Sequence, residues 1–567
     1  MADLTCAIAA KSETNDNADV DHGQSVIPEA GYNAERRLRH RLRSVFAHLA
    51  VWLVMTGWWV AGLVLHRHDL GWLIPFLVWL GLSIRLLTLY LPLGAFVVYV
   101  WRSISARTSL VTKHFSQSSK LIVLTVLTIV TILAATFSTK DTVGNTRADR
   151  AISLLGLAVF LGAFWATSKN RRMINWQPVV AGVLVQFLLG LFVLRTRAGY
   201  DIFDFVGFLA KSLLGFSGDA AAFLTSAEAL KSGWFLIIVL PPMIFFVSFV
   251  HLLHYWGWVQ WLVRKLAHFF LYAMGISGAE AVAASASPFL GQGESAVLIK
   301  EFLPLLTHAE IHQVMASGFA TIAGSVLSAY IGLGISPLVL VSSCVMSIPA
   351  AITISKLRYP ETEDPQTSGG VVRIPEEEEE TRPHNSLHAV AKGSWMGIKI
   401  AGMVAASVLC ILALLALVNG LLKWWGSYLN IDQLSVQLIV GYLFYPIAFL
   451  LGVERDSTEI LKVAQLIGMK VVTNEFVAKV IYYLQYSELT QNAAYESLSS
   501  RSRLIAMYAL CGFGNISAVG VQIGALSQLA PGRAAAVTQV AVSALVSGIF
   551  ATLTSASIAG MLMDSSA

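Results

Sequence analysis

The sequence predicts an all-α polytopic membrane protein with about eleven transmembrane helices and two re-entrant hairpins. The chain of 567 residues is 56% hydrophobic and only 13% charged, whereas a soluble domain carries about a quarter charged residues. Apolar runs of about 20 residues recur along it, which is the length of a membrane-spanning helix, whereas a transmembrane barrel would show short alternating strands. The net charge of +5 lies mostly beside these runs, so it indicates topology and does not imply nucleic-acid binding.

The N-terminal region predicts a cytoplasmic, disordered tail. Residues 1–44 are polar and lack an early apolar core, so we expect no cleaved signal peptide there. Five arginines between positions 36 and 43 precede the apolar run from Phe46 to Leu65. Because positive charge collects on the cytoplasmic side of a span, the N-terminus is predicted to be cytoplasmic.

Apolar runs predict the transmembrane helices, and amphipathic runs predict helices at the membrane interface. The predicted spans lie near 46–65, 71–101, 121–137, 152–168, 177–194, 233–253, 311–333, 336–356, 398–420, 503–529 and 534–563. The amphipathic runs are 200–224 and 256–274. Residues 358–386, which include five consecutive glutamates, predict a solvated acidic linker.

Two further segments are too interrupted for straight spans and predict re-entrant hairpins. The first begins at Gly275 and is dense in Gly, Ala and Ser, and the second covers 435–486. Each hairpin carries one carboxylate within a polar motif, Glu294 in the first and Glu475 in the second. Acids at membrane depth are costly and rare, so these two indicate a substrate or ion path.

A similar segment follows each hairpin, Gly-Phe-Ala-Thr-Ile at 318–322 and Gly-Phe-Gly-Asn-Ile at 512–516. Glycine and polar residues inside a span mark helices that can unwind and offer backbone groups to a ligand. Paired interrupted helices in two halves of a chain indicate the central binding site of a transporter. The alternative is that these small residues only allow helices to pack closely.

The polar residues of these motifs have the chemistry to bind a nucleoside. Carboxylates and amides accept hydrogen bonds from ribose hydroxyls and pair with a base edge, and a site built from them discriminates against ligands that lack a matching group. Neither motif contains Lys or Arg, which favours nucleosides over nucleotides. The polar set is Gln292, Glu294, Asn474, Glu475, Asn515 and Ser517, and Phe513 and Val326 offer apolar surface to a ring face.

The sequence resembles the concentrative nucleoside transporter family over about residues 200–567. The resemblance rests on five motifs, Gly291-Gln292-Gly293-Glu294-Ser295, the GFATIAGSV run at 318–326, Gly468-Met469-Lys470, Asn474-Glu475-Phe476-Val477-Ala478 and Cys511-Gly512-Phe513-Gly514-Asn515. The additional N-terminal spans are similar to those of eukaryotic members. The resemblance implies a homotrimer in the plasma membrane, in which a scaffold domain makes the trimer contacts and a transport domain carries the nucleoside across by an elevator-like movement.

The resemblance also divides the chain into segments, with the two hairpin-containing segments forming an inverted repeat. These are a cytoplasmic disordered tail (1–44), extra N-terminal transmembrane helices (45–138), scaffold helices with interfacial helices (139–274), the first hairpin and unwound helix of the transport domain (275–357), the acidic linker (358–397), a scaffold helix (398–434), the second hairpin and unwound helix of the transport domain (435–533) and a C-terminal helix (534–567).

By matching position, the resemblance assigns roles to individual residues. The base would face Gln292, Gly293 and Glu294, with Val326 beside it, while Glu475 and Asn515 would hold the ribose, and Phe513 would line the pocket. Ser517, which is adjacent to the position of the family's ribose-contacting serine, is predicted as a further substrate-binding residue. Two positions depart from the family pattern: Gly293 stands where a hydroxyl residue is usual, and Ala518 stands where the family has a serine. We expect broad use of purine and pyrimidine nucleosides such as uridine and adenosine.

The coupling cation is predicted from the first hairpin. The resemblance places a sodium site between the hairpin tip and the unwound helix, and implies Thr321 and the carbonyls of Leu290 and Ile322 as ligands. Ser287 stands where the family has an asparagine, and a short hydroxyl weakens such an oxygen cage. Burial disfavours the charged form of Glu294, which suits this residue to carry a proton. We therefore expect proton coupling with no bound metal, and sodium coupling is the alternative.

An enzyme and a channel are the alternative classes of protein. A membrane enzyme would need a nucleophile–base pair or a metal set, and the sequence offers only the two carboxylates, which a retaining hydrolase could use. Histidines such as His251, His254 and His268 lack the spacing of metal ligands and are expected at the interface. A channel would show neither saturation nor uphill accumulation. We expect a carrier that is not an enzyme and that needs no cofactor.

Overall fold

The computed structural model is helical, and it confirms the predicted class of an all-helical polytopic membrane protein. It describes residues 29–65, 73–90, 116–138, 141, 144–231, 234–292, 294–300, 302–332, 335–363, 365, 383–431, 433–475, 477–478 and 498–563. The predicted tail up to residue 28, the five glutamates of the linker and the second hairpin from residue 479 onward lie outside these ranges.

Most helix boundaries lie within about five residues of the predicted spans, whereas the helices Glu29–Leu65 and Ser386–Tyr428 extend well beyond the predicted 46–65 and 398–420. In chain order the helices are α1 (Glu29–Leu65), α2 (Leu73–Tyr90), α4 (Gln117–Phe137), α5 (Arg147–Ala166), α6 (Trp176–Arg195), α7 (Arg197–Leu224), α8 (Ala227–Lys231), α9 (Phe235–Tyr255), α10 (Trp258–Met274), α11 (Gly278–Leu290), α12 (Glu294–Val297), α13 (His308–Ala320), α14 (Gly324–Gly332), α15 (Pro337–Arg358), α16 (Ser386–Tyr428), α17 (Val436–Leu450), α18 (Ser457–Val472), α20 (Ser500–Leu510), α21 (Ile516–Leu529) and α22 (Ala534–Leu562).

Within the described ranges, nine helices or broken helices are long and apolar enough to cross a membrane. Two of the eleven predicted spans are not among them. One is 71–101, of which the structure describes the part that forms α2, and the other is 503–529, which is divided into the short helices α20 and α21. The second predicted hairpin also resolves into separate helices, α17 and α18, before the described residues stop.

Residues 1–116 and 117–567 form two compact units. In the first unit, α1 and α2 pack through tryptophans. Trp59 stacks on Trp79 with ring centroids 4.6 Å apart, and the Trp52 indole donates a hydrogen bond to Ser83 Oγ at 2.9 Å.

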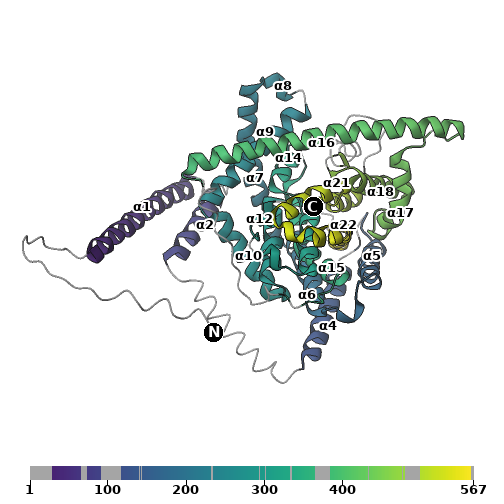
Figure 1. Cartoon of the computed structure of the whole chain (residues 1–567), viewed down its shortest axis with the longest axis horizontal. Helices are drawn as coiled ribbons and strands as arrows, with labels where there is room; N and C mark the ends of the chain where they lie inside the picture. The colour runs from purple at the N-terminus through teal and green to yellow at the C-terminus, as the bar shows by residue number, and fades with distance from the viewer. Residues whose placement is uncertain are drawn as a thin grey trace, which may run out of the picture. The chain divides into compact units, whose positions relative to one another are not determined.

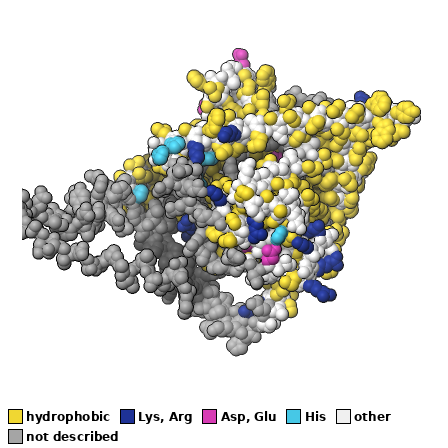
Figure 2. Space-filling view, in the orientation of Figure 1, with side chains coloured by type: hydrophobic (Ala, Val, Ile, Leu, Met, Phe, Trp, Pro, Cys, Tyr) yellow, Lys and Arg dark blue, Asp and Glu magenta, His cyan; other side chains and the backbone are white. Residues whose placement is uncertain are grey.

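The long helix α16 packs along α9 (Figure 1). Two glycines of α16 allow the close approach, because a Cβ on Gly393 would lie 2.7 Å from the Cα of Ser248 and one on Gly397 would lie 2.9 Å from the Cα of Ile244. The other face of α16 is apolar and exposed, with Leu409 70%, Leu417 60% and Trp424 75% exposed. Figure 2 shows hydrophobic side chains over the C-terminal end of α16 and over α17, as expected for a surface in contact with lipid or with another membrane helix.

Helix α22 runs through the centre of the unit and packs on α13, α15, α20 and α5. Its 29 residues span about 44 Å at 1.5 Å per residue. At its N-terminal end, Arg533 Nε donates to the Pro304 carbonyl in the connection of the first hairpin at 3.0 Å. At its C-terminal end, Asn145 Nδ2 donates to the Met563 carbonyl at 2.7 Å, and the Asn145 Oδ1 accepts from Arg501. Because Arg501 follows the second hairpin in the chain, the two hairpins are rooted at opposite ends of α22.

Two helices are interrupted near the middle of the unit. Helix α13 stops at Ala320, Thr321 is extended (φ −112°, ψ 164°), and α14 starts at Gly324. Helix α20 stops at Leu510, and α21 starts after Asn515, whose side chain accepts from the backbone N–H of Ala518 as an N-cap. These two breaks are the segments that the sequence repeat predicts to unwind.

Candidate functional site

A cavity of about 360 Å³ lies where both breaks meet the end of the first hairpin. This volume falls in the range of small-molecule sites, which is about 300–1,000 Å³. Five parts of the chain line this cavity. The first hairpin contributes Leu290, Gly291, Gln292 and Val297, and the first break contributes Ala323, Ser325 and Val326. The second hairpin contributes Asn474 and Glu475, the second break with α21 contributes Phe513, Asn515, Ser517, Ala518 and Val521, and α16 contributes Met396, Ile400, Met403, Val404, Ser407 and Val408.

The structure therefore brings six of the eight predicted substrate-binding residues into one cavity. They are Gln292, Val326, Glu475, Phe513, Asn515 and Ser517. Gly293 lies outside the described residues, and Glu294 opens α12 with a side chain that is not described. The predicted roles of all eight residues in binding the substrate remain predictions.

Glu475 and Asn515 form a buried polar pair at one end of the cavity. Asn515 Nδ2 donates to Glu475 Oε2 at 2.6 Å. Asn515 is 2% exposed and Glu475 is 5% exposed. Asn515 Oδ1 accepts from Ser517 Oγ at 2.7 Å and from the Ala518 backbone N–H at 2.8 Å. Because the N-cap fixes the Asn515 amide, its nitrogen points at Glu475 and holds the carboxylate. A carboxylate held in this way can accept charge-assisted hydrogen bonds from neighbouring hydroxyls.

The predicted cation ligands lie where the hairpin tip packs on the first break. A Cβ on Gly324 would lie 3.2 Å from the Phe289 carbonyl oxygen, which shows how closely the two backbones approach. Ser287 and Thr321 are buried, and their hydroxyls donate to the carbonyls of Ala283 (2.8 Å) and Ser317 (3.0 Å). Each hydroxyl oxygen keeps lone pairs for a ligand. Together with the carbonyls of Leu290 and Ile322, these oxygens suit a hard cation.

No group of three or more His, Cys, Asp or Glu side chains within the described ranges could hold a metal ion. A site for a transition metal would need such a group, whereas an alkali cation is bound by neutral oxygens of the kind found at the hairpin tip.

Lys470 is a buried cation behind the second break, and the sequence shows it as the last residue of the Gly468-Met469-Lys470 motif without indicating what it contacts. Its Nζ donates to the Ala509 carbonyl at 2.9 Å and to Thr552 Oγ1 at 3.2 Å, and its side chain is 1% exposed. The last carbonyls of a helix have no partner within the helix, and a cation there is also favoured by the helix dipole. Lys470 therefore stabilises the end of α20 at the interruption.

The wall that α16 contributes to the cavity was not predicted from the sequence. Met396, Ile400, Met403 and Ser407 recur at helical spacing on one face of α16. This spacing is a signal in the sequence, but an apolar face of this kind is also typical of contact with lipid. Only the fold shows that this face closes the cavity.

Each hairpin has a polar root. In the first, Ser277 with Glu280 and Thr307 with Glu310 form capping boxes. Lys356 Nζ lies 2.5 Å from Glu280 Oε1, and the Thr307 hydroxyl donates to Glu361 at 2.9 Å. All of these residues except Thr307 line a second cavity of about 200 Å³. A Lys–Glu pair and two caps are structural features, since they fix the start of α11 and α13.

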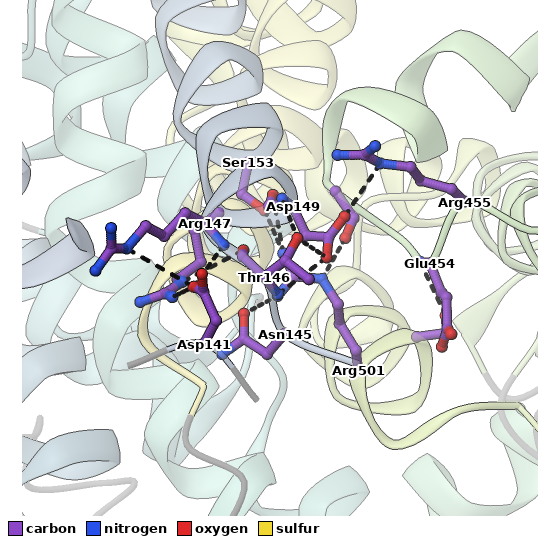
Figure 3. Close-up of polar contacts among 12 residues, drawn as sticks. Asp141, Asn145, Thr146, Arg147, Asp149, Ser153, Glu454, Arg455 and Arg501 are labelled. Carbon is purple, nitrogen blue, oxygen red and sulfur yellow. Dashed lines mark hydrogen bonds and ion pairs between the residues drawn. The ribbon is translucent and has the colours of Figure 1, made fainter. Parts of the chain in front are cut away.

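In the second root, Arg501 is 1% exposed and crosses between elements (Figure 3). Its guanidinium donates to the carbonyl of Gly452 (2.6 Å), to Asn145 Oδ1 (2.7 Å) and to Ser153 Oγ (2.9 Å). The Arg501 bonds fix the second hairpin to α5.

Nearby, the backbone N–H and the hydroxyl of Thr458 donate to the exposed Asp456 and hold the pKa of that carboxyl below its usual value.

A polytopic helical protein in which two interrupted helices meet at a polar cavity has the architecture of a secondary transporter. Three family models match the chain, described as the Na+ dependent nucleoside transporter C-terminus over 339–560, the Na+ dependent nucleoside transporter N-terminus over 155–228, and Gate, nucleoside recognition, over 236–337. This chain belongs to the concentrative nucleoside transporter family, which is a family of transporters and not of enzymes.

Individual relatives agree with this assignment. Solute carrier family 28 member 3 of Mus musculus is 38% identical over 423 residues, which are 73% of this chain and 59% of the relative. Sodium/nucleoside cotransporter 1 of Rattus norvegicus is 36% identical over 427 residues, which are 73% of this chain and 64% of the relative. The chain thus spans about three fifths of the length of these curated relatives.

Solved structures of CNTnw resemble the fold. The inward-facing, substrate-bound state matches with a TM-score of 0.69 and 33% identity, over 74% of this chain and 98% of that chain. An outward-facing state of a variant matches with a TM-score of 0.70 and 33% identity, over 74% of this chain and 99% of that chain. The two states match about equally well, and the similarity establishes the fold.

Proposed function

We propose that this chain is a cation-coupled symporter that imports purine and pyrimidine nucleosides against their gradient. The observation that carries the proposal is the buried Glu475–Asn515 pair, which lies in the same cavity as Gln292 and Val326. The pair supplies an oriented carboxylate for the two ribose hydroxyls. Gln292 supplies an amide for the base edge, and Val326 supplies an apolar surface for its ring face. A cavity that combines these groups fits a nucleoside.

We propose sodium as the coupling ion, which is carried together with the nucleoside as a second substrate. The family models are described as sodium dependent, and a relative is named a sodium/nucleoside cotransporter. These descriptions favour the sodium alternative over proton coupling, which we expected because Ser287 stands where the family has an asparagine. Thr321, Ser287 and the carbonyls of Leu290 and Ile322 would supply the oxygens. One charge moving through ~100 mV releases about 2.3 kcal/mol, which supports roughly 40-fold accumulation.

We further propose that the cavity moves along α16. The hairpins and interrupted helices supply one side of the cavity, and α16 supplies the other. The α16 wall is almost entirely apolar, so displacement along it would break few hydrogen bonds. The hairpin roots at opposite ends of α22 support an inverted repeat with one hairpin for each side of the membrane. The exposed apolar face of α16 would then contact lipid or the other subunits of a homotrimer in the plasma membrane.

The proposal is tested by uptake of tritiated uridine and adenosine into vesicles that contain the full chain, with sodium and pH gradients imposed separately. Saturable uphill uptake that follows the sodium gradient would support the proposal. Uptake that ignores sodium, is stimulated by external acid and collapses with a protonophore would replace sodium with a proton. Absence of saturable nucleoside uptake under every gradient would contradict nucleoside transport itself, and release of free base or ribose would indicate a hydrolase.

A further inference from the structure

Gln522 is a buried glutamine directly behind the cavity. It lies on α21 next to Val521 and one helical turn after Ala518, and both of these residues line the cavity. Its side chain is 1% exposed, and its Nε2 donates to the Met315 carbonyl at 3.2 Å. Its amide therefore connects α21 to α13 at the level of the substrate.

Gln522 lies beside Gln292 because Gly318 has no side chain. A Cβ on Gly318 would overlap the Gln522 amide nitrogen and would lie 3.0 Å from the Cβ of Gln292. The two glutamines therefore occupy the space on the same side of Gly318. One of them lines the cavity, and the other belongs to the layer behind it.

The hydrogen-bonding groups of the two glutamines are complementary. The Gln292 Oε1 and the Gln522 Oε1 are both buried, and neither accepts from a donor in the part of the chain that the structure describes. A buried acceptor is normally satisfied. A primary amide nitrogen carries two hydrogens, and Gln522 donates one of them to Met315. The second hydrogen is a donor that can satisfy the Gln292 Oε1, because the two side chains lie on the same side of Gly318.

We propose that Gln522 is a positioning residue that sets which end of the Gln292 amide faces the base. This inference rests on the proposed nucleoside transport. A donor from Gln522 holds the Gln292 Oε1 away from the cavity, so the Gln292 Nε2 faces the cavity. An outward N–H pairs with a carbonyl on the base edge, such as O4 of uracil or O6 of hypoxanthine, and opposes the amino group of cytosine or adenine. Gln522 thereby makes the site favour oxo bases within both base classes.

The test uses two substrate pairs that differ in this one group, uridine against cytidine and inosine against adenosine. For each pair the ratio of Vmax/KM is measured for the wild type and for Gln522→Met, which keeps the length of the side chain and removes its donors. The wild type should prefer uridine and inosine, and the variant should reduce both ratios ~3- to 10-fold, the range for one hydrogen bond. Gln528→Met is the matched control, since Gln528 is an exposed glutamine on the same helix.

A purely structural role for Gln522 would lower Vmax for all four nucleosides and leave both ratios unchanged, and that result would overturn the inference. A wild type that shows no preference for the oxo base in either pair would overturn it as well. Because the wild-type uptake is measured first, failure of nucleoside transport is distinguished from failure of the role of Gln522.

A second set of variants tests the same contact from the other side. Gly318→Ala should displace the Gln522 amide and reduce the ratios as Gln522→Met does. In Gln522→Ala the overlap with the Gln522 amide is removed, while the 3.0 Å contact with the Gln292 Cβ stays. Adding Gly318→Ala to Gln522→Ala should therefore change the ratios by less than Gly318→Ala does in the wild type, which is the behaviour of two changes that remove one interaction. Additive effects in the double variant would contradict the proposal.

Discussion

The backbone N–H of Phe513 donates to the carbonyl oxygen of Thr321 at 3.1 Å, so the two interrupted helices are hydrogen-bonded to each other at their breaks. Thr321 belongs to the expected cation ligands, and Phe513 precedes by two residues the Asn515 that holds Glu475. A cation that orders one break therefore also orders the other through this bond. Binding free energies that are coupled in this way are reciprocal, so the nucleoside should raise the affinity for the cation as much as the cation raises the affinity for the nucleoside.

Gly512→Ala should abolish uptake, because Gly512 places the second break against the first. Its φ is +152°, and a Cβ there would lie 2.8 Å from Thr552 Cγ2 and 2.9 Å from the Ala320 carbonyl oxygen. The backbone would have to move, and the bond between Phe513 and Thr321 would break. Uridine uptake normalised to surface expression measures the effect. Gly520→Ala is the control, since a Cβ at Gly520 meets nothing within 4 Å and alanine favours the helix; equal uptake by the two variants would contradict the argument.

Glu475→Gln should raise the KM for uridine by ~10- to 100-fold, because hydrogen bonds to a charged group contribute about 1.5–3 kcal/mol each. The substitution keeps the shape of the side chain and removes its charge, and the Asn515 amide loses a charged acceptor. The same variant should transport 2′,3′-dideoxyuridine about as well as the wild type does, since this analogue has neither ribose hydroxyl. A KM that rises equally for both substrates would show that Glu475 does not bind the ribose.

Ser287→Asn should lower the sodium concentration needed for half-maximal uptake. An amide carbonyl reaches further than the Ser287 hydroxyl, whose hydrogen is donated to Ala283, and adds a stronger oxygen ligand for a hard cation. Uridine uptake is measured over a sodium series at fixed pH. Thr321→Val, which removes a hydroxyl on the opposite side of the expected site, should raise the half-maximal concentration. If neither variant changes the sodium dependence, the cation does not bind between these residues.

The sequence predicted most helices of the second unit, and six of its eight predicted substrate-binding residues line the cavity, because their signals are local. Apolar length predicts spans, and Gly with polar residues inside a span predicts the breaks at Thr321 and Asn515. The α16 wall and Gln522 could not be predicted in this way. Met403 on an apolar helix face and Gln522 in a short helix acquire their roles only through packing against distant segments, and one sequence contains no record of those contacts.

Arg501→Lys should destabilise the protein by roughly 2–4 kcal/mol, because it removes a guanidinium whose several donors are all buried. Arg501 donates to Gly452, Asn145 and Ser153, which belong to separate parts of the chain (Figure 3). A lysine has one nitrogen and cannot reach all of these acceptors. The midpoint of thermal unfolding in detergent measures the loss. Arg503→Lys is the control on the same helix, where the side chain is half-buried and donates to the Leu498 carbonyl at 3.2 Å. Equal midpoints for the two variants would show that the Arg501 bonds do not hold the second hairpin to α5.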